Sequence, residues 1–211
     1  MSTQLTQRLI DAAADTIEAN AELLTSLDQA IGDGDHGLNM KRGFAAIREA
    51  RDELARLALP EALSKAGMLL VTKVGGASGP LYGSLLLAMG KAGAGGASDR
   101  ATLVAMFSEG VAAVKKRGKS EAGEKTMLEV LVPVLDELRS AVASGEANGS
   151  LIERIKGAAL QGLEASKPLR ASKGRASFLG ERSIGHLDPG AQSSCLLVCA
   201  VCDVVQRESA A

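Results

Sequence analysis

Aromatic side chains and an excess of one charge are both missing from this sequence. It has no Trp, one Tyr and three Phe, so aromatic residues make up 2% of the 211 residues. Surfaces that stack the bases of single-stranded nucleic acid or the rings of sugars need more aromatic side chains than that. The 24 basic and 25 acidic side chains give a net charge of −1. A protein that neutralises nucleic-acid phosphates carries a clear basic excess, so we expect no nucleic-acid partner.

Long apolar runs are absent as well. No stretch of 18 consecutive apolar residues exists, and a membrane-spanning helix needs about that many. Residues 1–15 are polar and acidic, whereas a signal peptide is first basic and then apolar. The sequence therefore predicts a soluble, cytoplasmic protein without membrane contact.

The cysteines are few and close together. Cys195, Cys199 and Cys202 have the spacing that places them on one face of a helix. They are too near one another to link distant segments, and no fourth metal ligand lies nearby. We interpret them as small, reduced core residues.

The composition favours helices, because alanine is abundant and β-branched residues are few. We find no alternating strand pattern, no internal repeat and no linker between domains. Residues 1–211 are therefore expected to form one all-α domain whose neighbouring helices are antiparallel. Apolar spacing predicts eight helices, over about residues 3–27, 40–57, 60–74, 80–92, 99–117, 126–144, 151–166 and 189–207. Ser98 or Asp99 is the expected N-cap of the fifth of these helices, and Asp188 that of the eighth.

An acidic, glycine-containing loop lies between the first two of these helices. Asp28, Asp33 and Asp35 repel one another unless a cation offsets their charges. Oxygen ligands select hard cations, so Mg²⁺ is favoured over Ca²⁺ and Mn²⁺. The spacing does not fit an EF-hand, and the G-x-G-x-x-G pattern at residues 32–37 has no preceding strand. The alternative interpretation is a solvated acidic turn.

Two further loops contain small residues that let backbone N–H groups approach an anion. Residues 75–80 precede a helix, whose N-terminus favours negative charge. Residues 118–126 resemble a Walker phosphate loop, but they have one residue too many before the lysine and follow a helix instead of a strand. For residues 118–126 we therefore predict only a loop that lies near phosphates or a nucleobase. The alternative for both loops is an ordinary turn that connects two helices.

A polar stretch over residues 167–187 lacks a helical period. A segment this long inside a compact helical domain usually has a ligand or partner to order it. Arg175 is the candidate phosphate clamp within it, because a guanidinium can pair with two oxygens at once. A solvated loop is the alternative.

Taken together, these motifs resemble a known family. The segments GDGDHG (32–37), GGASGPLYGS (75–84), GEKTMLEVL (123–131) and KGRASFLGERSIGHLDPGAQSS (173–194) are similar to the nucleotide-binding L subunit, or C-terminal domain, of dihydroxyacetone kinases. The resemblance spans nearly the whole chain. It implies an eight-helix antiparallel up-and-down barrel with the nucleotide site formed by loops at one end.

The resemblance also assigns site residues. Asp28, Asp33 and Asp35 would hold two Mg²⁺ ions that bridge the phosphates of ADP or ATP, and Arg175 would be the catalytic residue. The residues that would contact the nucleotide are His36, Gly37, Leu38, Asn39, Ala77, Ser78, Gly118, Met127, Arg175, Asp188, Pro189 and Gly190.

The implied activity is one half of a kinase. In the family a separate K subunit holds dihydroxyacetone covalently on a histidine, and the L subunit delivers the phosphoryl group and is inactive alone. Three alternatives stay open. ADP could remain bound and be rephosphorylated by a phosphocarrier of the phosphotransferase system. ATP could exchange freely in a kinase for dihydroxyacetone or for a related ketose such as a tetrulose. Finally, the chain could be a nucleotide-bound regulatory module.

Overall fold

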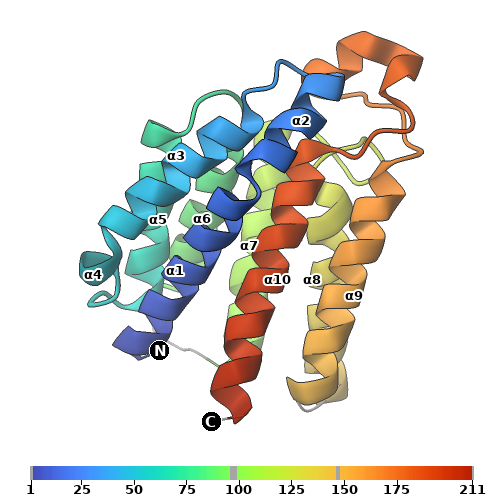
Figure 1. The fold of residues 1–211 in the computed structure, drawn as a ribbon. Coiled ribbons are helices and arrows are strands. Elements are labelled where there is room, and N and C mark those ends of the chain that lie inside the picture. The colour runs from blue at the N-terminus through green and yellow to red at the C-terminus, as the bar shows by residue number, and fades with distance from the viewer. Residues whose placement is uncertain (1, 96–98, 146–147, 211) are drawn as a thin grey trace.

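The structure of this chain is a computed structural model that describes residues 2–95, 99–145 and 148–210 (Figure 1). Within these ranges every regular element is a helix, which confirms the all-α prediction. The elements are α1 (Thr3–Ala19), α2 (Ala21–Ile31), α3 (His36–Glu49), α4 (Arg51–Leu54), α5 (Leu59–Lys73), α6 (Ser78–Ala92), α7 (Arg100–Gly118), α8 (Leu128–Ser144), α9 (Asn148–Ser166), the 3₁₀ segment η1 (Arg175–Ser183) and α10 (Pro189–Ala210).

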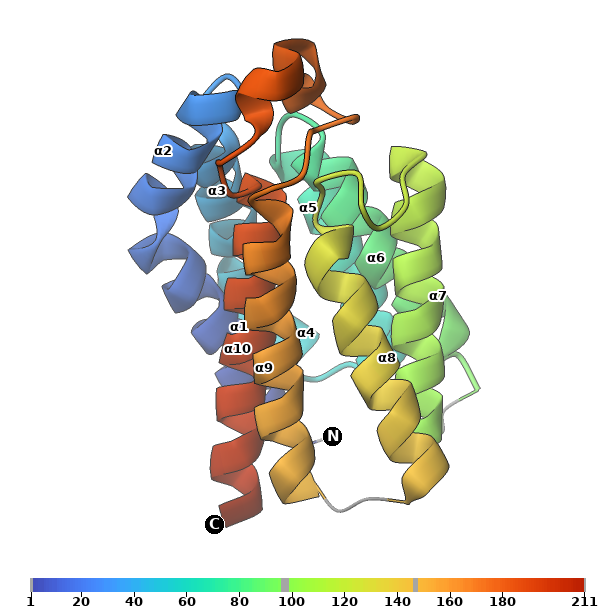
Figure 2. The same cartoon turned by 90° about the vertical axis from the view of Figure 1, so that its right-hand side faces the viewer.

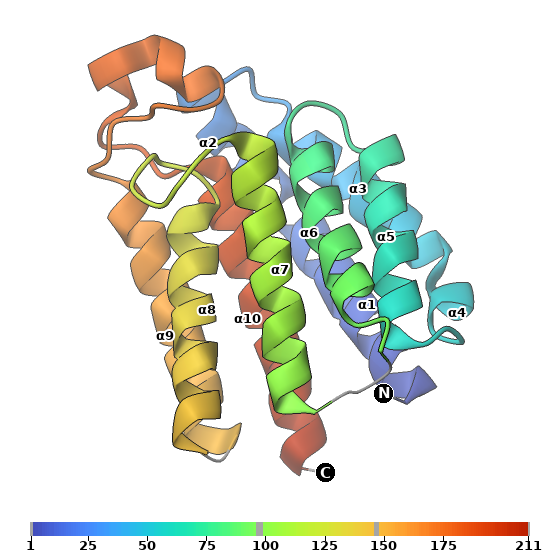
Figure 3. The same ribbon diagram turned by 180° about the vertical axis from the view of Figure 1, so that it is seen from behind.

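The long helices run alternately up and down and close on themselves. The helices α1, α3, α5, α6, α7, α8, α9 and α10 pack against one another in that order, and α10 returns to α1. Figures 2 and 3 show the consequence for the loops: the segments that precede α3, α6, α8 and α10 all lie at one end, opposite the two chain termini. We call this the loop end. None of the helices in the described part of the chain is long and apolar enough to cross a bilayer.

Two of the predicted α-helices are each divided into two in the structure. The first predicted helix is broken at Asn20, where the amide side chain donates to the Thr16 carbonyl oxygen at 2.8 Å. Asn side chains compete with the helix for such backbone partners, so two helices replace one. In addition, residues 51–54 form the short separate helix α4. At the start of α7, the side chain of Asp99 accepts a hydrogen bond from the Thr102 N–H, as an N-cap does. The other capping candidate, Ser98, lies outside the described residues.

The core consists of two apolar clusters. The larger one fills the space among α1, α2, α3, α5, α6, α7 and α8, and the smaller one lies among α8, α9 and α10. Cys195 and Cys202 are buried in the smaller cluster, and all three cysteines are free thiols. This agrees with the predicted core role of the cysteines.

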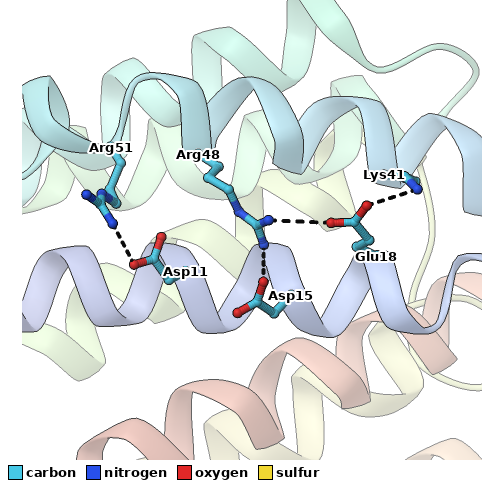
Figure 4. Close-up of polar contacts among 6 residues, drawn as sticks. All are labelled: Asp11, Asp15, Glu18, Lys41, Arg48 and Arg51. Atoms are coloured by element: carbon cyan, nitrogen blue, oxygen red, sulfur yellow. Dashed lines mark hydrogen bonds and ion pairs between the residues drawn. The ribbon is translucent and has the colours of Figure 1, made fainter.

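Ion pairs join the outer faces of α1 and the α3–α4 segment (Figure 4). Arg51 lies 2.9 Å from Asp11, and Lys41 lies 3.0 Å from Glu18. Arg48 pairs with both Asp15 and Glu18. These side chains are between about a third and three quarters exposed, and ion pairs in contact with solvent contribute only about 0–1 kcal/mol each. The stability of this packing therefore comes mainly from the apolar residues beneath them.

Close packing of α8 against α9 depends on Gly162. A Cβ atom at this position would overlap the carbonyl oxygen of Glu129, whereas a Cβ at Gly157 on the same helix would meet no atom within 4 Å. We expect Gly162→Ala to destabilise the protein by about 1–3 kcal/mol through overpacking. Gly157→Ala should instead stabilise it by roughly 0.5–1 kcal/mol, because alanine is the better helix former. Urea unfolding of the two variants measures this difference, and equal effects would contradict the close contact.

Candidate functional site

Three carboxylates converge at the loop end. Ligand atoms of Asp28, Asp33 and Asp35 all lie within 4.8 Å of one another. Asp28 is buried at the end of α2, and its Oδ2 accepts hydrogen bonds from the N–H groups of Asp35 at 2.9 Å and His36 at 3.0 Å. The loop between them is tight: a Cβ at Gly32 would overlap the Asp28 carboxylate, and Gly34 has φ +76°. This oxygen-only donor set fits a hard divalent cation.

Arg175 approaches the same cluster from η1. Its Nη2 lies 2.9 Å from Oδ2 of Asp33. The segment that carries it shows no helical period in its sequence, yet residues 175–183 form a 3₁₀ helix interrupted at Gly180. A 3₁₀ helix has three residues per turn, so a search for the α-helical period does not detect it. The ion pair brings a guanidinium to the edge of the candidate cation site.

A cavity of about 480 Å³ opens beside these residues. Eight residues predicted to contact a nucleotide line it: His36, Ala77, Ser78, Gly118, Met127, Asp188, Pro189 and Gly190. The other four, Gly37, Leu38, Asn39 and Arg175, are not among its lining residues. Leu38 is 58% exposed, and Gly37 packs so closely on α2 that a Cβ would overlap the Ala21 carbonyl oxygen. The sequence motifs thus come together at one cavity, with these four residues outside its wall.

Four helices begin at this cavity. His36, Ser78 and Pro189 are the first residues of α3, α6 and α10, and Met127 precedes α8. The first N–H groups of a helix have no partner within it and carry partial positive charge, so helix N-termini attract anions. A cavity with four such N-termini beside three carboxylates can hold a polyanion and the cation that joins it to the carboxylates.

A buried hydrogen-bond network connects three of these helices. His36 Nδ1 lies 2.9 Å from the Ser78 hydroxyl, and its Nε2 lies 3.0 Å from the Ser193 hydroxyl. Tyr82 OH in turn lies 2.8 Å from Ser193 Oγ and 2.7 Å from Ser194 Oγ. Burial lowers the pKa of His36 and raises that of Tyr82 to about 12, so both side chains are neutral near pH 7. Each side chain joins helices that are distant in the sequence.

Sequence reasoning missed Tyr82, Ser193 and Ser194, as well as the group around Glu129. The Glu129 carboxylate accepts hydrogen bonds from the N–H groups of Gly123 at 2.8 Å, Lys125 at 3.0 Å and Thr126 at 3.3 Å. At the start of α10, Asp188 Oδ2 accepts from the Ala191 N–H at 2.7 Å, and burial raises the Asp188 pKa to about 7. The only available signal was position, since Tyr82, Glu129, Ser193 and Ser194 all lie within the four conspicuous motifs.

The fold and the site thus define a helical domain whose loops at one end bring three carboxylates next to a cavity where four helices begin. Comparison with known proteins gives the family: residues 30–203 match the model of the DAK2 domain. The chain belongs to the DAK2 domain family.

Among its relatives is the "PEP-dependent dihydroxyacetone kinase 1, ADP-binding subunit DhaL" of Listeria innocua, which is 47% identical over 190 residues, 90% of both chains. The "PEP-dependent dihydroxyacetone kinase, ADP-binding subunit DhaL" of Escherichia coli is 42% identical over 180 residues, 85% of this chain and 86% of the relative. These matches confirm the family resemblance that the sequence motifs indicated.

Longer proteins contain the same unit. The "D-erythrulose kinase" of Mycolicibacterium smegmatis is 36% identical over 209 residues, which are 96% of this chain and 35% of the relative. The crystal structure of the dihydroxyacetone kinase of C. freundii matches with a TM-score of 0.76 and 24% identity, over 96% of this chain and 35% of that one. This likeness shows the fold, and it shows that the chain spans about a third of the longer proteins.

Proposed function

We propose that this chain is the nucleotide-binding subunit of a dihydroxyacetone kinase. It binds ADP or ATP with Mg²⁺ and delivers a phosphoryl group to dihydroxyacetone, which a separate K subunit holds covalently on a histidine. The observation that carries the proposal is the convergence of three aspartates within 4.8 Å, beside a cavity where four helices begin. The names of the Listeria and Escherichia relatives support the nucleotide and the substrate.

In this proposal Asp28, Asp33 and Asp35 hold two Mg²⁺ ions. The ions, when bound, neutralise phosphate charge and join the phosphates to the carboxylates. A solved "dihydroxyacetone kinase from C. freundii in complex with AMP-PNP and Mg2+" shares the fold with a TM-score of 0.75. The partial positive charge at the starts of α3, α6, α8 and α10 attracts the phosphates, and the predicted contact residues of the cavity wall surround the nucleotide.

Arg175 is the proposed catalytic residue. Its Nη2 lies 2.9 Å from Oδ2 of Asp33, which supports a guanidinium beside the proposed cation site and the transferred phosphoryl group. Phosphoryl transfer depends mainly on positioning and on charge stabilisation. A planar guanidinium can stabilise two oxygens of the transferring group at once.

The partner is inferred from the longer relatives. The unit makes up 35% of the D-erythrulose kinase and of a triokinase/FMN cyclase, and the Listeria and Escherichia relatives are named as subunits, which together support a partner subunit. The loop end offers the partner a contact, since Phe178, in the same 3₁₀ segment as Arg175, is 89% exposed. The relatives named PEP-dependent or PTS-dependent favour a phosphocarrier of the phosphotransferase system as the phosphoryl donor.

A second candidate substrate is a related ketose. The D-erythrulose kinase is 36% identical to this chain over 209 residues. The choice of ketose would then be made by the partner subunit, and the phosphoryl-donating site described here would serve either sugar.

The first functional prediction concerns the cation. Asp33→Ala should make Mg²⁺-dependent binding of ADP undetectable, because the phosphates would face two carboxylates with too little metal between them. Asp136→Ala, which removes an exposed carboxylate on α8, should leave the affinity unchanged. Isothermal titration calorimetry with Mg²⁺ and with EDTA measures both. Tight ADP binding that survives the chelator and the Asp33 substitution would contradict the metal assignment.

The second prediction concerns the partner. The purified chain with ATP, Mg²⁺ and dihydroxyacetone should form no triose phosphate, and adding the K subunit with a phosphoryl donor should start turnover. A coupled assay that follows triose phosphate through NADH oxidation measures it, with ATP in one arm and the phosphocarrier with phosphoenolpyruvate in the other. Turnover by the chain alone would place a substrate site within these 211 residues and overturn the half-kinase proposal.

The third prediction concerns Arg175. In the reconstituted assay, Arg175→Lys should lower kcat by about 10²–10³-fold, the size of effect seen when one charge-stabilising donor is removed. It should change ADP affinity much less, because the lysine keeps the positive charge. Arg182→Lys, in the same 3₁₀ segment, is the matched control and should retain most of the rate. Near-normal turnover by Arg175→Lys would exclude the bidentate role.

A further inference from the structure

We propose that Lys125 is a positioning residue that holds two walls of the nucleotide cavity in their working places. This inference rests on the proposed function, since it assigns the cavity to the nucleotide. Lys125 is 1% exposed and is the largest of the fully buried side chains in the described part of the chain.

The ammonium group of Lys125 donates to three backbone carbonyl oxygens. Nζ lies 2.6 Å from the oxygen of Ser166, 2.5 Å from that of His186 and 3.3 Å from that of Lys167. These carbonyls stand at the two ends of the segment 167–187, where the Gly185 N–H also donates to Lys167 O at 2.8 Å. Lys125 therefore joins the base of the segment that carries Arg175 to the loop that precedes α8.

The backbone of Lys125 is fixed as firmly as its side chain. Its φ of +61° lies in the left-handed region that side-chain-bearing residues rarely adopt. The Lys125 N–H donates to Glu129 Oε1 at 3.0 Å, so α8 itself holds this conformation. The contact with α8 thus fixes where the Lys125 side chain lies and which way it points. Its ammonium group in turn fixes the backbone of residues 166, 167 and 186 through the hydrogen bonds to their carbonyl oxygens.

Two of the proposed nucleotide contacts lie a short distance from these bonds. Met127 is two residues after Lys125, and Asp188 is two residues after His186; both line the cavity. A displacement at Nζ would therefore move both walls of the cavity together. Lys125 itself also lines the cavity. Its three ammonium protons already have carbonyl acceptors, so in this proposal Lys125 acts through the two walls and not as a phosphate ligand.

The free-energy cost of burying a charged lysine side chain supports a specific role for Lys125. Burial lowers the pKa of Lys125, and the carboxylates of Asp188 and Glu129 offset only part of that shift. An apolar side chain of similar length would fill the same space without desolvating a charge, and such replacements are often neutral or stabilising. What the apolar side chain would lose is the directional connection between the two loops.

The test uses Lys125→Met, which keeps the length and removes the charge and the donors, with Lys116→Met on the exposed face of α7 as the control. Calorimetry should show the Kd for Mg–ADP raised by about 10–100-fold, as expected when binding groups move by an ångström, with unchanged stoichiometry. The control should equal the wild type. A lower stoichiometry with an unchanged Kd would mean that Lys125 only maintains the fold, and it would overturn the inference.

A second measurement needs no nucleotide and separates this inference from the proposed function. Hydrogen–deuterium exchange of the unliganded protein should become faster in residues 123–127 and 167–187 of Lys125→Met, and stay unchanged in α1 and α5. Equal exchange in these segments would overturn the positioning role even if Mg–ADP binds. If the wild type binds no Mg–ADP, the proposed function fails while the exchange result still decides whether Lys125 orders these segments.

Chemical rescue of Lys125→Ala gives a measurement that would not change if Lys125 only stabilised the fold. This variant also replaces Lys125→Met if the methionine variant does not fold. Ethylammonium, which supplies three N–H donors, should restore part of the lost Mg–ADP affinity, whereas tetramethylammonium, which has none, should not. Equal effects of the two cations, or no rescue by ethylammonium in a folded variant, would contradict the hydrogen-bonded role.

Discussion

Four helices that begin at one end of the molecule are the feature on which the rest of the site depends. The starts of α3, α6, α8 and α10 bring backbone N–H groups and partial positive charge to one cavity. Asp28 accepts hydrogen bonds from two N–H groups at the start of α3, those of Asp35 and His36, and it is also one of the three converging carboxylates. The same geometry therefore creates the attraction for an anion and fixes the ligands for a cation.

Buried polar contacts keep these helix starts in place. His36 joins α3 to α6 through Ser78 and to α10 through Ser193, while Glu129 and Lys125 organise the loop before α8. Buried hydrogen bonds are costly to break, because a donor or acceptor left without a partner loses its solvation. These contacts hold the cavity wall together without a ligand, and phosphoryl transfer, the proposed reaction, depends largely on such positioning and on charge stabilisation.

The closed packing of the helices explains why the same unit occurs both as a separate chain and as about a third of a longer one. Since α10 packs against α1, each long helix has a neighbour on both sides and the core is covered without another domain. The loop end is left open to a partner, and exposed Phe178 lies there.

The sequence by itself determined the all-helical fold, the positions of most helices and the four loops that carry the site. It did so because helical periodicity, N-caps such as Asp99 and Asp188, and glycine-containing motifs are local signals. Only the tertiary structure decided that Leu38 and Gly37 lie outside the cavity wall, that residues 175–183 form a 3₁₀ helix, and that Tyr82, Ser193, Glu129 and Lys125 hold the loops together. The physical reason is distance along the chain: the bonds of His36 to Ser193 and of Lys125 to His186 join residues 157 and 61 positions apart. No local pattern specifies such partners; they are set by the packing that brings the helix ends together.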